Sequence, residues 1–353
     1  MTGQRVIISQ LGKEPLQAIE QFATLQPMEP PDPATLGARD VVVRVQSAAV
    51  GWVDLLMSTG QYQHVPVPPY TPGLEYAGTV HWAGAEANAA VGARVLVDPF
   101  LAGPRSLGAY RQYGGFATYA VAPAEAVLSL PDALSFDQAC NLLGNYETAY
   151  HCLVARGRLA AGETVLVHGA SGSVGLAAVQ VAKLLGATVI ATGRNPAKLD
   201  VVRAQGADHV VALREGWRDE IKALTEGRGV DVVYDGVGGD VSVESLRCVR
   251  FGARYLIVGW AATPFAARGA MAANQLPTNL IMMKGLDVLG CPTVISTTKD
   301  PSIRRERLAQ VLAWASAGQI KPLVARAYPL ADFAAAMRAK WNGEAVGGLV
   351  LHP

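Results

Sequence analysis

The sequence has few cysteines, no excess of charge of either sign and no long apolar run. Its four cysteines, Cys140, Cys152, Cys248 and Cys291, are scattered along 353 residues and include no Cys-x-x-Cys pair. This spacing argues against a disulfide framework and against a thiolate zinc cluster. It fits a reducing compartment, so we expect a cytoplasmic protein.

Charge and hydropathy exclude two further classes of protein. Lys and Arg total 30 against 29 Asp and Glu, which leaves a formal charge of +1. Binding to a nucleic acid or an anionic membrane needs a broad basic face, and this balance supplies none. No apolar run reaches the ~18–20 residues of a membrane span, and the first residues lack the apolar core of a signal peptide. We therefore expect no nucleic-acid partner, no membrane contact and no cleaved leader.

Glycine, proline and apolar residues are abundant. Half of the residues are hydrophobic, 37 are Gly and 21 are Pro, so the chain can bury a large core and makes many turns. Because single domains usually hold roughly 100–200 residues, we expect two domains. The first, to about residue 130, has β-branched runs such as Val41–Val45 between turns. Prolines exclude a helix from its segment 66–73.

From residue 131 the pattern alternates between short apolar runs and helical periodicity. Such continuous apolar runs are typical of parallel strands covered by helices on both faces, so the pattern predicts an α/β, doubly wound, Rossmann-type parallel sheet. Helices are expected at Val174–Leu185, Pro196–Gln205 and Ser302–Ala317, and a last strand in the segment GGLVLHP is expected to return to the first domain. The strands are expected at Thr164–His168, Thr188–Ala191, His209–Val211, Val230–Tyr234, Tyr255–Val258 and Asp287–Leu289.

The most specific motif is a glycine-rich loop, A-x-G-x-x-G, between the first strand and the first helix of this sheet. Its candidate cofactor contacts are Ala170, Gly172, Ser173, Val174 and Gly175. Gly172 lets backbone N–H groups approach a pyrophosphate, and Gly175 lets the helix pack on the strand. The helix N-terminus attracts the anion. An ordinary Gly-rich turn is the alternative, but the strand–loop–helix–strand context favours a dinucleotide site.

The end of the second strand indicates which dinucleotide binds. An NAD site has Asp or Glu there for the ribose 2′-hydroxyl, whereas this chain has Thr192, Gly193 and Arg194, followed by Lys198. A guanidinium suits a 2′-phosphate, so NADPH is the predicted cofactor. The alternative for Arg194 and Lys198 is a solvated start of a helix.

Several segments in this order resemble the zinc-independent quinone oxidoreductase branch of the medium-chain dehydrogenase/reductase family, the zeta-crystallin-like branch. The resemblance covers nearly the whole chain. It is specific for the family but gives little information on the substrate. The matching segments are Ser58–Tyr62, Tyr70–Gly78, Gly114–Ala117, Asn145–Tyr150, Gly169–Gly175 and Gln319–Pro322.

The resemblance implies an overall organisation. It implies a GroES-like β-rich domain over residues 1–130, an NADP-binding Rossmann domain over 131–319, and a tail, about 320–353, that returns to the first domain. An active site between the two domains is implied. The last strand of the sheet often pairs across a dimer in this family, so Leu286–Gly290 would be the edge of a homodimer.

The resemblance also addresses metal binding. Zinc-dependent relatives take ligands from a Cys-x-x-Asp segment, a Gly-His-Glu segment and a Cys before a Thr-x-Tyr. The matching positions are Gly51, Leu74 and Gly144. None of these side chains has a lone pair for a metal, so no metal is expected.

Hydride transfer without a metal needs a neutral donor near the acceptor oxygen, where charge develops. Tyr62 matches the family's cleft tyrosine and is the first candidate, with a packed aromatic as the alternative. Asn145 is the second, as an amide able to touch the nicotinamide or the acceptor. The family often has Asn where Gly51 stands, so one polar group is lost here.

Other residues of the matching segments receive cofactor or structural assignments. The resemblance assigns Thr148 to the cofactor site, and also Val258, Gly259 and Trp260, because this segment resembles the one beside the nicotinamide. Four polar residues outside these assignments receive structural ones: Asp54 and Glu75 as hydrogen-bond acceptors, His168 as a core histidine, and His64 as a solvent-exposed residue.

The expected function is an NADPH-dependent, metal-free reductase of quinones or α,β-unsaturated carbonyls. Two alternatives stay open. One is an enoyl thioester reductase, which would need a basic patch for acyl-carrier or CoA phosphates. The other is a low-activity NADPH-binding protein with a crystallin-like or interaction role. The sequence does not identify the natural substrate.

Overall fold

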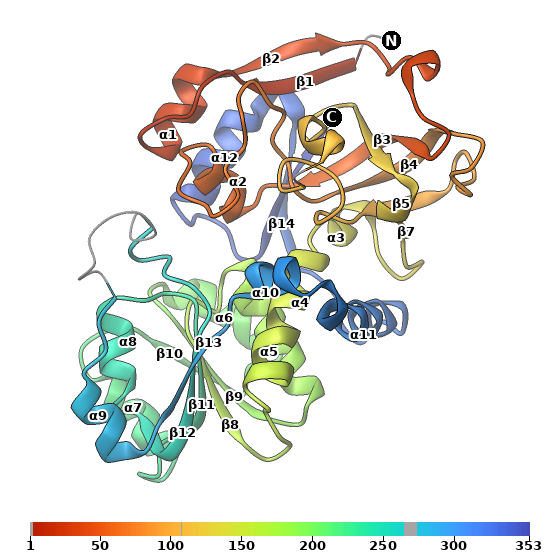
Figure 1. Ribbon diagram of the computed structural model, residues 1–353. Coiled ribbons are helices and arrows are strands. Elements are labelled where there is room, and N and C mark those ends of the chain that lie inside the picture. Colours follow the sequence, from red (N-terminus) through yellow and green to blue (C-terminus); the bar gives the residue numbers. More distant parts are fainter. Residues whose placement is uncertain (1–2, 107, 265–273) are drawn as a thin grey trace. The chain divides into compact units, whose positions relative to one another are not determined.

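The computed structural model of the chain describes residues 3–106, 108–264 and 274–353, and they form two compact units (Figure 1). The first unit comprises residues 1–144 and 321–353, and the second comprises 145–320. The segment 131–144 therefore belongs to the first unit, although the sequence analysis expected the second domain to begin at 131.

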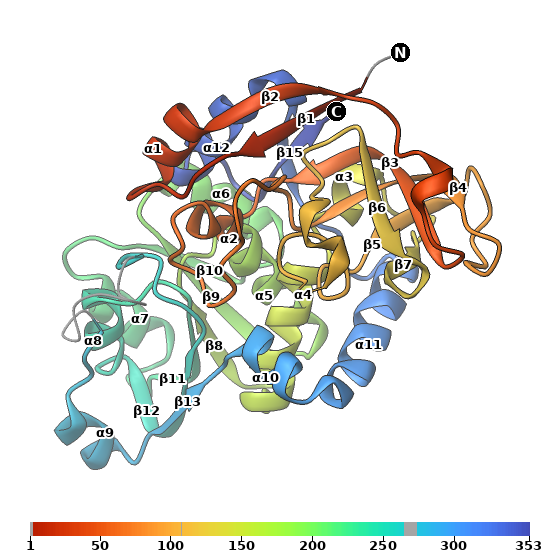
Figure 2. The same ribbon diagram turned by 45° about the horizontal axis from the view of Figure 1, so that its top comes forward.

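The first unit is built on a seven-stranded sheet in which β14, β15, β3, β4, β5 and β7 are neighbours and β6 pairs with β3. A two-stranded hairpin, β1–β2, forms a separate ribbon beside α12 (Figure 2). The strands are β1 Gly3–Ile8, β2 Ala23–Met28, β3 Asp40–Ala49, β4 Tyr76–Ala83, β5 Arg94–Val97, β6 Tyr119–Pro123, β7 Val127–Ser129, β14 Val324–Pro329 and β15 Gly348–His352. The α-helices are α1 Pro15–Gln17, α2 Trp52–Met57, α3 Phe136–Ala139 and α12 Phe333–Trp341.

The C-terminal strand joins this sheet as the sequence predicted. In β15, Val350 and Leu351 pair antiparallel with Ala49 and Ala48 of β3. Both leucines of the segment GGLVL, together with Phe333 and Met337 of α12, are buried in one apolar core with the side chains of β3 and β4. The tail is therefore part of the core of the first unit.

The second unit is a six-stranded parallel sheet in the order β10-β9-β8-β11-β12-β13. Helices cover both faces, with α7 and α8 on one side and α5 on the other (Figure 1). The strands are β8 Thr164–Val167, β9 Thr188–Gly193, β10 His209–Ala212, β11 Val230–Asp235, β12 Val249–Ile257 and β13 Asp287–Gly290. The α-helices are α4 Leu143–Tyr150, which begins in the first unit, α5 Ser173–Leu184, α6 Pro196–Ala204, α7 Trp217–Leu224, α8 Asp240–Ser245, α9 Thr278–Lys284, α10 Thr293–Lys299 and α11 Arg304–Ser316.

These elements confirm the predicted mixed α/β fold with a Rossmann-type sheet and a GroES-like β unit. All six predicted strands of the second unit are present, but β12 starts at Val249, six residues before its predicted start at Tyr255. The prediction missed that beginning because Arg250, Gly252 and Arg254 interrupt the apolar pattern there. No helix among the described residues has the length and apolar character needed to cross a bilayer.

Candidate functional site

The predicted cofactor residues of the second unit gather at one edge of its sheet. Strands β8, β9, β11 and β12 run parallel, so their carboxyl ends share that edge. Ligands of open α/β sheets bind at this edge, where the strand order reverses. Here the order reverses between β8 and β11, and the glycine-rich loop follows β8 directly.

The backbone of the glycine-rich loop is shaped for a close approach to an anion. Gly169 has φ +63°, the left-handed region that favours glycine. A Cβ at Gly175 would lie 2.4 Å from the carbonyl oxygen of Gly169, so only glycine lets α5 pack here. Gly172 is exposed, and a Cβ there would meet only that same oxygen, at 3.5 Å. The loop and the first turn of α5, with Ser173 and Val174, therefore fit a pyrophosphate.

At the end of β9, the side chain of Thr192 points into the core, whereas that of Arg194 is exposed. The Thr192 side chain is fully buried and its hydroxyl lies 2.7 Å from Nδ1 of His168, so this side chain faces the core and not a cofactor. Arg194, directly after the strand, is exposed, and Lys198 on α6 is partly exposed. Asn195 caps α6 by accepting a hydrogen bond from the Ala197 N–H at 3.0 Å. The exposed cationic side chain therefore lies where the sequence predicted it.

His168 is a core histidine, as predicted. Its other ring nitrogen, Nε2, lies 2.6 Å from the Ser245 hydroxyl, so both nitrogens have partners. Burial lowers the pKa of His168 below its ordinary value, which keeps the imidazole neutral.

The segment after β12 lies at the same sheet edge, held by the end of β11. The N–H groups of Val258 and Gly259 both donate to the carbonyl oxygen of Asp235, at 2.8 and 3.2 Å. A Cβ at Gly259 would lie 3.3 Å from the carbonyl oxygen of Gly236, so the two backbones are close there. Trp260 is 40% exposed. This segment can therefore border a ligand at the edge.

Asp235 is a site-forming residue that the sequence analysis missed. Its side chain accepts hydrogen bonds from the N–H groups of Val237 and Gly238, at 2.8 and 3.1 Å, and from the hydroxyl of Tyr255 at 2.7 Å. Asp235 is buried, and these contacts fix the loop that follows β11. The available signal was a carboxylate at the end of an apolar run, followed by glycines.

Asn145 and Thr148 lie on α4, where the second unit begins. Both side chains are partly exposed. Between them, the buried Glu147 pairs with Arg304 at 2.7 Å and with Arg307 at 2.9 Å, both on α11. Removing one member of such a buried pair is strongly destabilising, so these ion pairs fix the orientation of α4 within the second unit.

The three positions matching zinc ligands are brought together in the first unit by two buried or partly buried carboxylates. Asp54 accepts hydrogen bonds from the N–H groups of Gly51 at 3.0 Å and Leu74 at 3.1 Å. Glu75 accepts one from the N–H of Gly144 at 2.5 Å. Asp54 and Glu75 are thus structural acceptors, as predicted.

These carboxylates also occupy the space that ligand side chains would need. A Cβ at Gly51 would lie 2.7 Å from Asp54 Oδ2, and a Cβ at Gly144 would lie 2.7 Å from Glu75 Oε2. Among residues 3–106, 108–264 and 274–353, no group of three or more His, Cys, Asp or Glu side chains could hold a metal. The residues at this position do not fit a zinc ion.

A lysine that the sequence analysis missed faces the same two carboxylates. Burial lowers the pKa of Lys340 to about 8, and the charges of Asp54 and Glu75 oppose that shift. Trp341, the next residue of α12, stacks on Trp52 of α2 with ring centroids 5.0 Å apart. Lys340 stands three residues after Met337, on the apolar face of its helix. A lysine at an apolar position of the helical pattern was the available signal.

Tyr62 lies in the loop after α2, with His64 and Arg105 close to it. The Tyr62 and His64 ring centroids are 6.0 Å apart. Burial raises the pKa of Tyr62 and the Arg105 guanidinium opposes that shift, so the phenol stays protonated at neutral pH. His64 is partly buried, which corrects the expectation of a solvent-exposed residue. Burial, and then Arg105, lower the pKa of His64.

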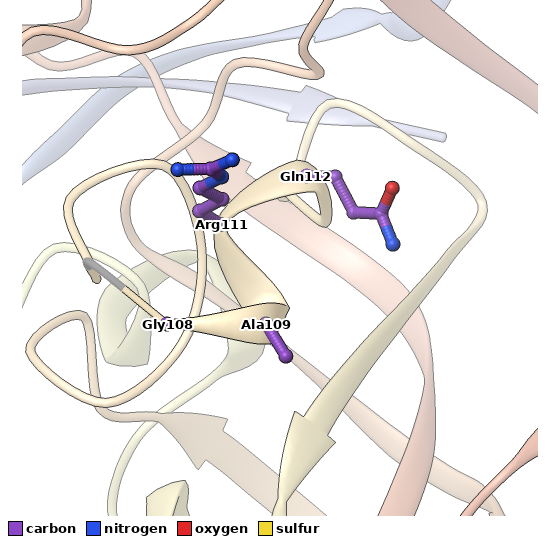
Figure 3. Close-up of a pocket in the computed structure, with 4 residues that line it drawn as sticks. All are labelled: Gly108, Ala109, Arg111 and Gln112. Carbon is purple, nitrogen blue, oxygen red and sulfur yellow. The ribbon is translucent and has the colours of Figure 1, made fainter.

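A separate surface hollow of the first unit is lined by Gly108, Ala109, Arg111 and Gln112 (Figure 3). These residues form or precede a single 3₁₀ turn, and all four are exposed. The hollow contains none of the predicted site residues.

Comparison with known proteins identifies the family. The alcohol dehydrogenase GroES-like domain matches residues 37–132, and the zinc-binding dehydrogenase family matches residues 173–315. The chain is 33% identical over 328 residues to a quinone oxidoreductase-like protein 2 homolog of Nematostella vectensis, covering 92% of this chain and 82% of that protein. It is 31% identical to the human quinone oxidoreductase, covering 88% of each.

Solved structures agree with this family. A quinone oxidoreductase of Pseudomonas syringae has a TM-score of 0.78 at 27% identity, with all of both chains covered. A mycobacterial protein solved in complex with NADPH has a TM-score of 0.79 at 25% identity, covering 99% of this chain and 100% of that one. The chain therefore belongs to the quinone oxidoreductase branch of the medium-chain dehydrogenase/reductase family and is an NAD(P)-binding oxidoreductase.

Proposed function

We propose that this protein reduces a quinone or an α,β-unsaturated carbonyl with NADPH and without a metal. The observation that carries the cofactor choice is the exposed Arg194 at the end of β9, where an acidic residue would repel a 2′-phosphate. The family and the quinone oxidoreductases similar to this chain support the acceptor class.

The second unit would hold the cofactor. The loop Ala170–Gly175 and the first turn of α5 would bind the pyrophosphate, Arg194 and Lys198 the 2′-phosphate, and Val258–Trp260 would border the nicotinamide. Thr148 and Asn145 would contact the cofactor from α4, Asn145 with an amide able to orient the nicotinamide or the acceptor. Thr192 would contribute through its backbone alone, because its hydroxyl is held by His168. When bound, NADPH supplies the hydride.

The first unit would supply the proton. Reduction leaves negative charge on the acceptor oxygen, and a neutral donor there stabilises the transition state. The Tyr62 hydroxyl stays protonated at neutral pH because burial raises its pKa. Tyr62 would therefore donate a hydrogen bond, and then the proton, to that oxygen. No step passes through zinc, since Gly51, Leu74 and Gly144 offer it no ligand.

We further propose a homodimer formed through the edge of the six-stranded sheet. In the part of the chain that the structure describes, β13 is one of the two outer strands of this sheet, and an unpaired strand edge is a template for pairing with a second chain. Large apolar side chains near it are exposed: Phe251 by 75%, Met282 by 74% and Met283 by 57%. A Cβ at Gly285, two residues before β13 begins, would lie 3.1 Å from the Phe251 ring.

A turnover screen tests the function. NADPH oxidation is measured with a panel of quinones and enones, with and without a chelator, alongside elemental analysis of the purified protein. We expect turnover with at least one acceptor, unchanged by chelation, and less than stoichiometric zinc. Turnover of enoyl thioesters alone would favour the thioester reductase. Binding of NADPH without turnover of any acceptor would favour a non-catalytic role. Stoichiometric zinc that is lost together with activity would overturn the metal-free mechanism.

A further inference from the structure

Arg105 is a buried arginine that the proposed reaction does not use. It is 7% exposed and lies within residues 98–106, which follow β5 and contain no helix or strand. Two contacts fix its guanidinium: Nε donates to the carbonyl oxygen of Pro99 at 3.3 Å, and the group lies 4.4 Å above the centroid of the Phe100 ring. The side chain is therefore held in one place.

One end of this guanidinium lacks a partner. Within residues 3–106, 108–264 and 274–353, the buried Nη2 of Arg105 makes no hydrogen bond. Asp54 interacts with Arg105 by charge alone, because its oxygens accept the N–H groups of Gly51, Gly73 and Leu74. A buried charged donor without a partner is destabilising, so the site is suited to an incoming acceptor.

The surroundings of Nη2 favour an anion as that acceptor. Tyr62 interacts with the Arg105 guanidinium by charge and by a side-chain hydrogen bond, and His64 interacts with it by charge. Both are neutral at pH 7, because burial raises the pKa of the Tyr62 hydroxyl and lowers that of the His64 imidazole. Arg105 therefore keeps a positive charge without a hydrogen-bonded counterion. A carboxylate matches the planar guanidinium in charge and geometry, whereas a neutral carbonyl would leave its charge unbalanced.

We propose that Arg105 binds a carboxylate of the substrate, so that the protein acts on quinones or enones that carry an acidic group. The identification of this anion as a substrate rests on the proposed function, whereas the anion site itself does not. Arg105 lies within residues 98–106, which contain no helix or strand, so a local shift of these residues, rather than the opening of a sheet, would admit the carboxylate to Nη2.

Direct binding tests the anion site without any turnover. Calorimetry of the 353-residue chain with benzoate, and with benzamide as its uncharged isostere, is done for three proteins: wild type, Arg105→Met and Arg111→Met. Arg111 is an exposed arginine six positions further on, so its variant removes the same charge from the same region. We expect benzoate affinity to fall at least about tenfold in Arg105→Met, the loss typical of a charge-assisted hydrogen bond, and to stay at the wild-type value in Arg111→Met. Wild-type protein that binds benzoate no better than benzamide, or equal losses in both variants, would overturn the proposal.

Turnover then tests the substrate class. The ratio of kcat/KM for 3-benzoylacrylic acid to kcat/KM for its methyl ester is measured in the same proteins. We expect this ratio to fall at least about tenfold in Arg105→Met and to be unchanged in Arg111→Met. A fall in both rate constants that leaves the ratio unchanged would contradict carboxylate recognition and assign Arg105 to the reacting oxygen. If neither a quinone nor an enone is reduced, the proposed function fails, while the benzoate result still decides on the anion site.

A second variant is used if Arg105→Met does not fold stably. If Arg105→Met lowers the melting temperature too far to be assayed, Arg105→Lys keeps the charge and loses the planar fork. Benzoate affinity below wild type, with benzamide unaffected, supports the proposal in that variant. Unchanged benzoate affinity contradicts it.

Discussion

Glu75 accepts a hydrogen bond from the backbone N–H of Gly144 at 2.5 Å, across 69 positions of the sequence. This contact joins the second and third of the segments that the resemblance matches to zinc-ligand segments, and Asp54 joins the first and second in the same way. The carboxylates therefore hold the positions that match zinc ligands through their backbone N–H groups, and Lys340 supplies the nearby positive charge. Hydrogen bonds within the protein therefore hold these three positions together.

Cofactor preference is expected to depend on Arg194. Arg194→Ala should weaken NADPH binding by roughly 1.5–3 kcal/mol, because a charge-assisted contact to the 2′-phosphate is lost. NADH binding should stay nearly unchanged, since NADH lacks that phosphate. Dissociation constants from fluorescence titration check both, with the exposed Arg228→Ala as the matched control. Equal losses for the two cofactors would contradict the assignment.

Tyr62 is expected to affect chemistry more than binding. Tyr62→Phe keeps the ring and removes the hydroxyl, so kcat on an enone should fall about tenfold or more while NADPH affinity changes little. The measurement is made where a deuterium isotope effect shows that hydride transfer limits turnover. Tyr113→Phe is the control, as a partly buried tyrosine of the same unit. A wild-type kcat in Tyr62→Phe would leave the proton to solvent.

Asp54 is expected to make stability depend on pH. Burial raises its pKa from 3.8 to about 6, against hydrogen bonds that lower it. Between about pH 4 and 6 the unfolded chain loses this proton while the folded protein keeps it, so stability falls as the pH rises through this window. Across the whole window the free energy of unfolding should fall by about 3 kcal/mol, because the pKa of Asp54 is raised by about 2.

This effect is measured as a difference between variants. The free energy of unfolding in denaturant is determined from pH 4 to 6.5 for wild type and Asp54→Asn, and the wild type should lose stability relative to the variant as the pH rises. Asp132→Asn, at a fully exposed carboxylate of the same unit, should follow the wild type. Parallel curves for wild type and Asp54→Asn would show that Asp54 ionises normally.

The proposed dimer is expected to depend on the outward N–H groups of β13. The N–H of Cys291 donates to Ile257 in β12, and N–H directions alternate along a strand, so the N–H of Gly290 points to the open edge. Gly290→Pro should therefore weaken dimerisation while sparing the β12–β13 ladder. Sedimentation equilibrium checks this, with Gly290→Ala as the control, because alanine keeps the N–H and its Cβ would meet nothing within 4 Å. A Gly290→Pro protein that remains dimeric would exclude this edge.

The sequence by itself determined the six strands of the second unit, except for the start of β12, and their order along the chain. Parallel strands covered on both faces are continuous apolar runs, and the glycine-rich loop is confined to a few consecutive residues, so local patterns are sufficient. The return of the C-terminal segment to β3 was also predictable, because an apolar strand at the end of the chain has to be buried. Position within the motif placed Arg194 correctly at the end of β9.

Only the tertiary structure decided what surrounds Asp54, Lys340 and Arg105. Nothing local distinguishes Arg105 from the exposed Arg111 six residues later. Its burial depends on Pro99, Phe100 and the loop after α2. Likewise His64 is partly buried, and the Thr192 hydroxyl faces His168, because of contacts with segments distant in the sequence. Burial and charge pairing are properties of the assembled fold, so a local sequence pattern determines the helix or strand but not which polar side chains lie inside.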